Sequence, residues 1–215
     1  TAINGLQYGF QVCSHAIGDR ANREVLDRYE SAFTELPQLA TDHRFRIEHA
    51  QHLHPEDIPR FAQLKVIPAM QAIHMSSDRA WAIDRLGEQR IKEGAYMWQS
   101  LLKSGIPIVN GTDVPVEPLN PIASFYAIVT RKTLQGTPDG GYEPAEKMTR
   151  EQALRSYTLD AAYGAFEEGI KGSITVGKLA DFTIYNQDLM KVAEKELLNT
   201  EIAMTIFGGE IVYTK

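Results

Sequence analysis

The chain has 215 residues, of which 43% are hydrophobic and 23% are charged, and its formal net charge at pH 7 is −6. This length and composition predict a soluble globular protein with one sizeable core and room for a small second domain. The acidic balance argues against a nucleic-acid partner, because binding to phosphates requires a surplus of Lys and Arg on one face.

Membrane insertion and secretion are also disfavoured. No apolar run reaches the length of about 18 residues that a transmembrane helix needs, and the first residues lack the basic and apolar regions of a signal peptide. A cytoplasmic location is therefore expected. The single cysteine, Cys13, excludes an internal disulfide, and its place beside Val12 in an apolar run predicts a small core residue. Because the chain starts at Thr1 and not at Met, we expect it to be a piece of a longer protein.

The first 168 residues alternate between strand-like and helix-like patterns. Pro55 suits the first position of a helix, and Gly105 suits a helix C-cap. Ser76, Ser77 and Asp78 predict a polar excursion after the third strand. Strands are expected at residues 9–15, 44–50, 65–71 and 106–111, and helices at residues 21–33, 56–64, 94–104, 122–132 and 149–158. Such alternation predicts parallel strands joined by right-handed crossovers.

The last part of the chain has a different pattern. Residues 172–185 are punctuated by glycines and rich in β-forming residues, and Gly208 and Gly209 separate two short apolar runs. Two adjacent glycines between such runs are typical of a β-hairpin turn. The sequence therefore predicts two domains, an α/β domain over residues 1–168 and a small β module over residues 169–215.

Three of the expected strands deliver a polar residue near their C-terminal ends. His15 and His49 end two apolar runs, and Asp113 follows the break at Asn110 and Gly111. Parallel α/β folds keep their chemistry at this end of the sheet. Two imidazoles and one carboxylate in such positions suggest a metal site. A single strand histidine can also be a hydrogen-bonded core residue, and an aspartate after Asn-Gly can be a turn cap.

Four segments resemble a known family. They are Ser14–Ala21 (SHAIGDRA), Ile47–Gln51 (IEHAQ), Gly111–Val116 (GTDVPV) and Gly177–Ile184 (GKLADFTI). They occur in the order and spacing of the metal-dependent amidohydrolases, and the nearest group is the amidohydrolase family 3 branch with the YtcJ-like proteins and N-substituted formamide deformylase. The resemblance covers nearly the whole chain, and four motifs in order are far more specific than any one of them.

The resemblance implies a distorted (β/α)8 TIM-type barrel with a small β-sandwich built from both chain ends. Matched strand by strand, His15 ends the fifth strand, His49 the sixth and Asp113 the eighth. The chain would then supply the second half of the barrel and the C-terminal part of the sandwich. The family's first-strand His-x-His pair and fourth-strand lysine or acid would lie before Thr1, in a missing N-terminal half of the same protein. A half-barrel has two exposed edges, so the isolated chain is expected to form a homo-oligomer.

The same resemblance implies roles for individual residues. His15, His49 and Asp113 would be ligands of a divalent metal, with zinc the expected ion. Asp113 would also accept a proton from the attacking water and pass it to the leaving amine. His74 follows the third strand in a loop that faces the substrate in this branch, so we expect it to bind the substrate.

Two residues just after His15 are candidates for supporting roles. Asp19 could fix a ligand imidazole, although a helix cap is the preferred interpretation, and Arg20 could pair with an acid near the ligands. Glu48 precedes His49 and should point to the opposite side of the strand, toward the helices, in a structural salt bridge. Trp81 and Trp98 are interpreted as core or pocket wall.

The remaining histidines receive simpler interpretations. His52 and His54 form a His-x-His pair, but they follow the second strand and precede Pro55 and an acidic helix start. We interpret them as loop residues and not as the missing first-strand metal motif. His43 is expected at the surface.

The sequence therefore favours hydrolysis of a non-peptide carbon–nitrogen bond in a small amide or formamide-like substrate by metal-activated water. Two alternatives stay open. The same fold could hydrolyse esters or isomerise its substrate, because function depends on residues placed on a fold. The chain could also be a non-catalytic fragment that binds its complementary half or self-associates. A serine hydrolase is disfavoured, because no Gly-x-Ser-x-Gly motif is present.

Overall fold

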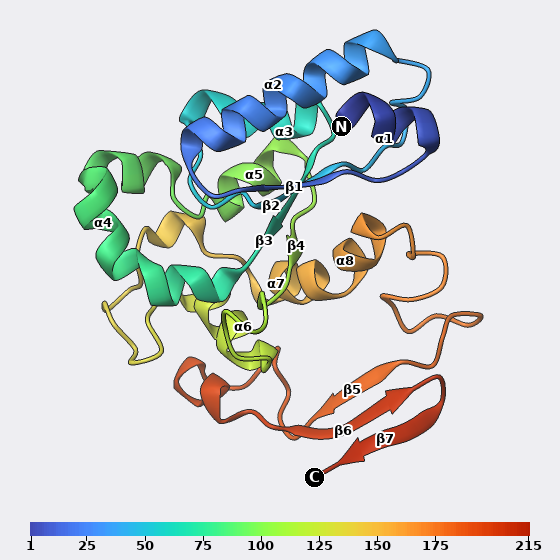
Figure 1. The fold of residues 1–215 in the computed structure, drawn as a ribbon. Helices are drawn as coiled ribbons and strands as arrows, with labels where there is room; N and C mark the ends of the chain where they lie inside the picture. The colour runs from blue at the N-terminus through green and yellow to red at the C-terminus, as the bar shows by residue number, and fades with distance from the viewer.

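The chain forms two separate sheets (Figure 1). The computed structural model describes all residues, Thr1–Lys215. The first sheet is parallel, with the order β1-β2-β3-β4, and consists of β1 (Cys13–Ala16), β2 (Arg46–His49), β3 (Ile67–Met70) and β4 (Val109–Asn110). The second sheet is antiparallel, with the order β5-β6-β7, and consists of β5 (Phe182–Tyr185), β6 (Ile202–Phe207) and β7 (Glu210–Thr214). The expected α/β fold with a parallel sheet is confirmed.

One helix precedes the parallel sheet, and the others connect its strands or follow it. They are α1 (Ala2–Tyr8), α2 (Asp19–Glu35), α3 (Ile58–Gln63), α4 (Ala72–Gly94), α5 (Trp98–Ser104), α6 (Pro121–Thr130), α7 (Arg150–Tyr157) and α8 (Leu159–Gly164). Three short 3-10 helices, η1 (Pro55–Asp57), η2 (Pro144–Glu146) and η3 (Glu194–Asn199), complete the chain. None of these helices combines the length and the apolar composition needed to span a bilayer.

Helices pack on one face of the parallel sheet. Leu26 of α2, Phe61 of α3 and Leu101 of α5 are completely buried, as is Ile47 of β2. They belong to one hydrophobic core of 36 buried residues. Burial of a large apolar side chain contributes about 1.5–3 kcal/mol, so this core supplies much of the driving force for folding.

The other face of β1 is open to solvent. Cys13 and His15 point to this face and are exposed, whereas Ser14 points to α2, where the Tyr29 hydroxyl donates to its Oγ at 2.7 Å. The expected core position of Cys13 is therefore wrong. The reason is the alternation of side chains along a strand, which places Cys13 on the same face as His15.

The segment after β3 also differs from the expectation. α4 begins at Ala72, directly after the strand, and includes Ser76, Ser77 and Asp78, so the predicted polar excursion is wrong. The buried side chains Ala72, Met75, Arg79 and Ala82 recur every three or four residues, which gives the segment one helical face. Gly87 interrupts the helix with φ 77° and ψ 161°. The helix expected over residues 94–104 is the end of α4 followed by α5.

His43 is buried and not at the surface as expected, with 7% of its area exposed. Its Nε2 lies 3.0 Å from the Leu64 carbonyl oxygen, and its Nδ1 accepts the backbone N–H of Phe45 at 2.8 Å. The ring stacks on Phe33 with centroids 4.0 Å apart. Because both ring nitrogens are hydrogen-bonded, the flat imidazole packs in the core at little cost.

The C-terminal hairpin is confirmed. β6 and β7 pair on either side of Gly208 and Gly209, whose φ values of 58° and 86° are the left-handed conformations that a tight two-residue hairpin turn requires. Of the segment at residues 172–185, only the end forms a strand, β5. All five residues of β7 are exposed.

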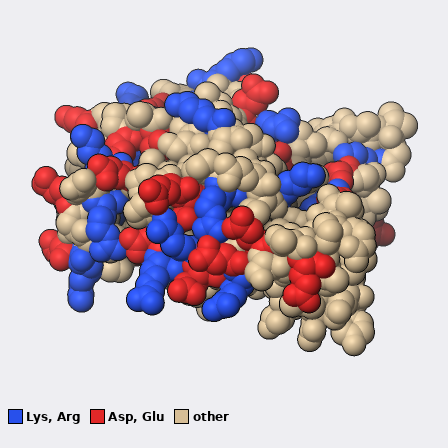
Figure 2. Space-filling model, turned by 90° about the horizontal axis from the view of Figure 1, so that it is seen from above, with Lys and Arg blue, Asp and Glu red and all other residues tan.

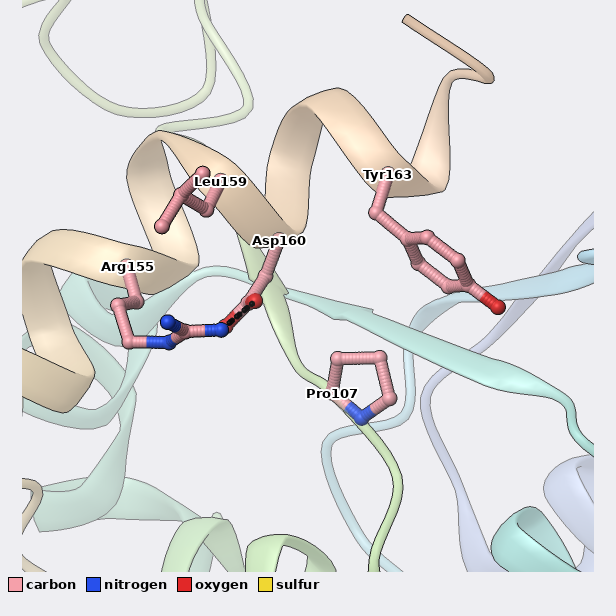
Figure 3. Close-up of a pocket in the computed structure, with 5 residues that line it drawn as sticks. All are labelled: Pro107, Arg155, Leu159, Asp160 and Tyr163. Atoms are coloured by element: carbon pink, nitrogen blue, oxygen red, sulfur yellow. Dashed lines mark hydrogen bonds and ion pairs between the residues drawn. The ribbon is translucent and has the colours of Figure 1, made fainter. Parts of the chain in front are cut away.

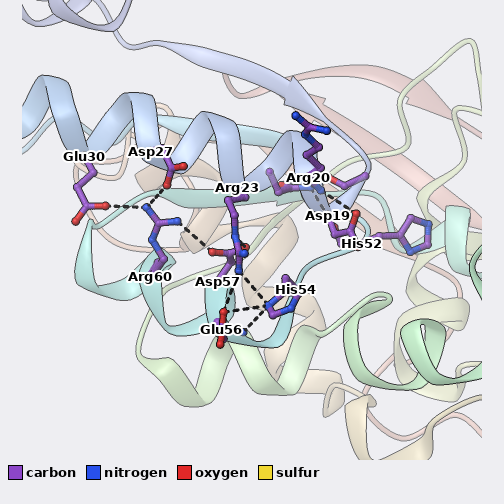
Figure 4. A network of polar contacts seen from close by, with 12 residues as sticks. Asp19, Arg20, Arg23, Asp27, Glu30, His52, His54, Glu56, Asp57 and Arg60 are labelled. Atoms are coloured by element: carbon purple, nitrogen blue, oxygen red, sulfur yellow. Dashed lines mark hydrogen bonds and ion pairs between the residues drawn. The ribbon is translucent and has the colours of Figure 1, made fainter.

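Acidic and basic side chains lie next to one another over the face seen from above, and not in a patch of one sign (Figure 2). Ion pairs join α2 to η1 and α3 (Figure 4). Arg60 contacts Asp27 and Glu30 at 2.7 Å each, and Arg23 contacts Asp57 at 2.8 Å. Asp27 and Glu30 are exposed, so their pairs contribute little individually, whereas Asp57 is buried and joins α2 to the start of α3.

Candidate metal centre

The predicted site residues lie at the C-terminal edge of the parallel sheet. Because the four strands run in the same direction, the ends of β1, β2, β3 and β4 meet at this edge. His15 lies in β1, His49 ends β2, Gln71 follows β3 and Asp113 lies three residues after the end of β4. One imidazole, one amide or one carboxylate thus stands at the end of every strand.

The backbone of His49 decides where its ring lies. Strict alternation would point His49 to the same side as Ile47, into the core beneath the helices. Instead φ is 78° at His49 and 43° at Ala50, two left-handed residues in succession. This turn brings the His49 ring edge-on to the ring of His15, with centroids 4.5 Å apart and planes at 75°.

The same turn explains the position of Glu48. This residue is paired in register with His15, and its carboxylate accepts from Arg46 Nε at 2.8 Å. The predicted salt bridge is confirmed, but its predicted direction toward the helices is wrong. Glu48 shares the open face of the sheet with Arg46, because it is His49 that leaves the regular alternation.

His49 is enclosed by polar and aromatic groups. Its Nδ1 lies 2.7 Å from Gln71 Oε1. The ring of His74, in the first turn of α4, stacks on it with centroids 5.8 Å apart and planes at 20°. Burial lowers the pKa of His49 below its usual value, although the Gln71 contact opposes this shift. The ring is therefore neutral at neutral pH, as a metal ligand must be.

His74 and Asp113 face each other across the site. The Nε2 of His74 lies 4.0 Å from Asp113 Oδ2, and it is buried without a hydrogen-bond partner. Asp113 has a left-handed φ of 59°, and its carbonyl accepts the N–H of Val116 in a turn. Its side chain is 38% exposed. A buried ring nitrogen without a partner beside a partly exposed carboxylate is an arrangement that a polar ligand could complete.

Three polar residues that the sequence interpretation missed support this edge. They are Gln71, Gln51 and Tyr96. The Tyr96 hydroxyl accepts from Gln51 Nε2 at 2.9 Å and donates to the His74 carbonyl at 3.2 Å, which fixes the first turn of α4. The sequence could have identified Gln71, because it comes directly after the apolar run of β3. This position corresponds to that of His49 at the end of β2. Tyr96 has no comparable signal in the sequence.

The other candidate residues lie apart from these contacts (Figure 4). Asp19 accepts from Arg90 at 2.6 Å and from its neighbour's backbone N–H at 2.8 Å, while the exposed Arg20 forms no ion pair. Neither side chain hydrogen-bonds to His15, His49 or Asp113. The supporting roles of Asp19 and Arg20 therefore stay predictions.

His52 and His54 diverge. His52 is buried, with 9% of its area exposed, and packs edge-on against Tyr96. His54 is partly exposed, and its Nδ1 accepts the Glu56 backbone N–H at the start of η1. Both residues lie outside the helices and strands, as the loop interpretation expects, and their imidazoles make different local contacts.

His15, His49 and Asp113 fit part of a metal site and do not form a complete ligand set. No three His, Cys, Asp or Glu side chains converge closely enough to hold a metal ion. The chemistry of the donors nevertheless suits zinc, because His15 and the neutral His49 offer imidazole nitrogens and Asp113 a carboxylate. The unpartnered Nε2 of His74 adds a further polar group at the same edge.

A cavity of about 330 Å³ lies elsewhere (Figure 3). It is lined by Pro107, Arg155, Leu159, Asp160 and Tyr163. Pro107 precedes β4, so the cavity lies at the N-terminal end of the sheet, opposite the histidines. Arg155 Nη2 donates to Asp160 at 3.2 Å, and burial raises the pKa of Asp160 despite this contact. This end of the sheet is typically concerned with stability in α/β barrels.

Comparison with known proteins identifies the family. The model of the amidohydrolase family, Amidohydro_3, matches residues 5–213. The chain belongs to the amidohydrolase family. The predicted family is thereby confirmed.

Curated relatives are much longer than this chain. The protein LONG AFTER FAR-RED 3 of Arabidopsis thaliana is 37% identical over 205 residues, which are 95% of this chain and 34% of that protein. The putative amidohydrolase YtcJ of Bacillus subtilis is 34% identical over 207 residues, 96% of this chain and 38% of that protein. N-substituted formamide deformylase of Arthrobacter pascens is 26% identical over 215 residues, 100% of this chain and 38% of that enzyme. The chain thus spans little more than a third of these relatives.

Solved structures of hydrolases share this fold. An uncharacterized metal-dependent hydrolase from Pyrococcus furiosus superimposes with a TM-score of 0.72 at 31% identity, over 88% of this chain and 37% of that chain. Atrazine chlorohydrolase TrzN from Arthrobacter aurescens, complexed with zinc, superimposes with a TM-score of 0.64 at 18% identity, over 99% of this chain and 46% of that chain. The second likeness concerns the fold alone.

Proposed function

We propose that this protein is a metal-dependent hydrolase of non-peptide carbon–nitrogen bonds, with a small amide or formamide-like substrate. The observation that supports it most directly is the gathering of His15, His49 and Asp113 at one edge of the parallel sheet in a member of the amidohydrolase family. The relative named N-substituted formamide deformylase supports the substrate class.

The metal would be held by His15 and His49 through imidazole nitrogens and by Asp113 through its carboxylate, with zinc as the expected ion. A bound divalent metal lowers the pKa of water toward about 7 and polarises a carbonyl oxygen. We propose that the remaining ligands come from a preceding half of the same protein. The coverage of the relatives, 34% to 38% of their length, supports this.

Asp113 is the proposed proton carrier. Its carboxylate accepts a proton as the water oxygen bonds to the amide carbon, and returns that proton to the nitrogen as the carbon–nitrogen bond breaks. The exposure of its side chain leaves room for water and substrate. His74 is the proposed substrate-binding residue, since its Nε2 lies unpartnered 4.0 Å from Asp113 Oδ2 and can donate to a substrate oxygen.

Zinc binding tests this proposal. In the full-length protein, His15→Ala and His49→Ala should each lower zinc affinity by at least about 100-fold, because each removes one of the few ligands. His54→Ala is the matched control. Its imidazole lies at the start of η1, so the substitution should leave zinc affinity unchanged. Hydrolysis of N-substituted formamides should fall with the bound zinc. Wild-type zinc affinity in both alanine variants would exclude the proposed ligands.

A further inference from the structure

The side-chain amide of Gln71 lies between the end of β3 and the His49 ring. Its Nε2 is 3.3 Å from the Ala69 carbonyl oxygen, and its Oε1 is 2.7 Å from His49 Nδ1. The backbone of Gln71 is held as well, because its carbonyl accepts the N–H of His74 in the first turn of α4. One contact thus holds the side-chain amide of Gln71 and the other holds its backbone, independently of the contact with His49.

These two contacts determine which atoms carry hydrogen. A carbonyl oxygen only accepts, so the group that faces the Ala69 carbonyl must be the NH2 of the Gln71 amide. The amide oxygen then faces His49. Because that oxygen also only accepts, His49 Nδ1 must be the donor, and in a neutral imidazole the other nitrogen, Nε2, then holds the free lone pair.

We infer that Gln71 is a positioning residue that holds His49 in the tautomer protonated at Nδ1 and so presents its Nε2 lone pair to a ligand. The tautomer follows from the hydrogen bonds alone. Its consequence for metal binding rests on the proposed function, in which His49 is a ligand.

The other contacts of His49 cannot replace Gln71 in this role. His15 packs edge-on at 4.5 Å and His74 stacks at 5.8 Å between centroids. Both contacts fix the plane of the ring, but packing against a ring does not distinguish one nitrogen from the other. Only the hydrogen bond to Gln71 makes that distinction, and groups that orient a ligand imidazole in this way typically change metal affinity 10–100-fold.

An amide and a carboxylate at position 71 would differ in charge. A carboxylate at position 71 would accept the same hydrogen bond, but it would bring a negative charge into contact with the His49 ring. The neutral amide fixes the tautomer without adding a second negative charge near Asp113.

The test is the tautomer of His49, measured by 15N NMR of labelled imidazoles in metal-free protein at about pH 8, where His is neutral. Wild type should show His49 protonated at Nδ1. Gln71→Met removes the acceptor and should shift His49 toward protonation at Nε2, whereas Gln71→Glu keeps the acceptor and should retain the wild-type tautomer. Gln89→Met, at an exposed position in α4, is the control and should change nothing. A wild-type His49 protonated at Nε2, or an unchanged tautomer in Gln71→Met, would overturn the inference.

Zinc titration separates this inference from the proposed function. Gln71→Met should weaken zinc binding by about 10–100-fold, and Gln71→Glu should recover part of that loss. A tautomer shift in Gln71→Met with unchanged zinc affinity would uphold the role of Gln71 in setting the tautomer and remove His49 from the ligand set. If Gln71→Met fails to fold, the wild-type tautomer alone decides the assignment.

Discussion

The two ends of the parallel sheet differ in how completely their polar groups are satisfied. At the N-terminal end, the Gln11 amide donates to the carbonyls of Arg44 and Gly164 at 2.6 and 2.7 Å. Arg44 in turn donates to both carboxylate oxygens of Glu168 at 2.8 Å and lies 4.0 Å over the ring of Tyr163. None of the buried side-chain atoms that lack a hydrogen-bond partner belongs to these residues.

The C-terminal end has strained residues and incomplete contacts. His49, Ala50 and Asp113 have left-handed backbones, and the buried nitrogens His74 Nε2 and His52 Nδ1 have no partner. Arg44, at the opposite end, is also left-handed, with φ 44°. Backbone conformation alone therefore does not distinguish the two ends. The two ends differ instead in their unpartnered polar groups, which lie at the C-terminal end, where a ligand could form hydrogen bonds with them.

The comparison predicts that substitutions at the C-terminal end change activity and that substitutions at the N-terminal end change stability.

The largest effect is expected for Asp113→Asn. It should lower kcat of the full-length protein about 1,000-fold, which corresponds to an activation barrier higher by about 4 kcal/mol, because the proton acceptor is lost. The free energy of unfolding should change by less than about 0.5 kcal/mol, since Asn tolerates a left-handed backbone. Asp139→Asn, in an exposed loop, is the control for both measurements. A kcat near the wild-type value would remove Asp113 from the chemistry.

His52 is the expected exception, a residue near the C-terminal end that acts on stability. Burial lowers its pKa to about 4, although Asp19 and Asp78 oppose this shift. In the unfolded chain His takes up its proton near pH 6.5. The unfolded state therefore binds more protons than the folded state between about pH 6.5 and 4. The contribution of His52 to the free energy of unfolding is complete above about pH 6.5 and falls by about 3 kcal/mol as the pH drops to about 4. Urea unfolding at pH 7 and 4.5 should show a much smaller loss in His52→Gln. Equal losses in variant and wild type would assign the acid sensitivity to other groups.

Arg44→Met should test the N-terminal end with a smaller effect. It removes the paired contacts to Glu168, the contact to Asp42 and the stacking on Tyr163, which should cost about 1–3 kcal/mol of unfolding free energy. Arg44→Lys should recover only part of this, because Lys cannot make two parallel hydrogen bonds to a carboxylate. Turnover of both folded variants should equal that of wild type. A loss of kcat without a loss of stability would contradict the division between the two ends.

Glu168→Gln should have the smallest effect. The carboxylate is 41% exposed, and Arg44 keeps its other partners when the charge is removed. Exposed ion pairs contribute about 0.2–1 kcal/mol, and the loss should shrink further at high salt. Thermal unfolding at low and high ionic strength measures both quantities. A loss as large as that of Arg44→Met would mean that Glu168 is the main anchor of this end.

Local signals in the sequence determined a large part of this structure. Thr149 and Gln152 form a capping box at the start of α7, Gly105 ends α5 with a left-handed φ of 98°, and the two glycines of the C-terminal hairpin turn lie between β6 and β7. Apolar runs that end in His15 and His49 also became strands. Caps, turns and strand periodicity act between residues a few positions apart, so they can be recognised without the fold.

The tertiary structure decided the rest. The left-handed turn at His49, the hydrogen bond from His49 to Gln71 and the burial of His43 against Phe33 all depend on packing between elements distant in the sequence. The helical course of α4 through three polar residues depends on one buried face that only the core defines. The sequence by itself therefore determined which residues stand at the strand ends. Which nitrogen each imidazole presents, and to which partner, is set by long-range contacts whose energies no local pattern encodes.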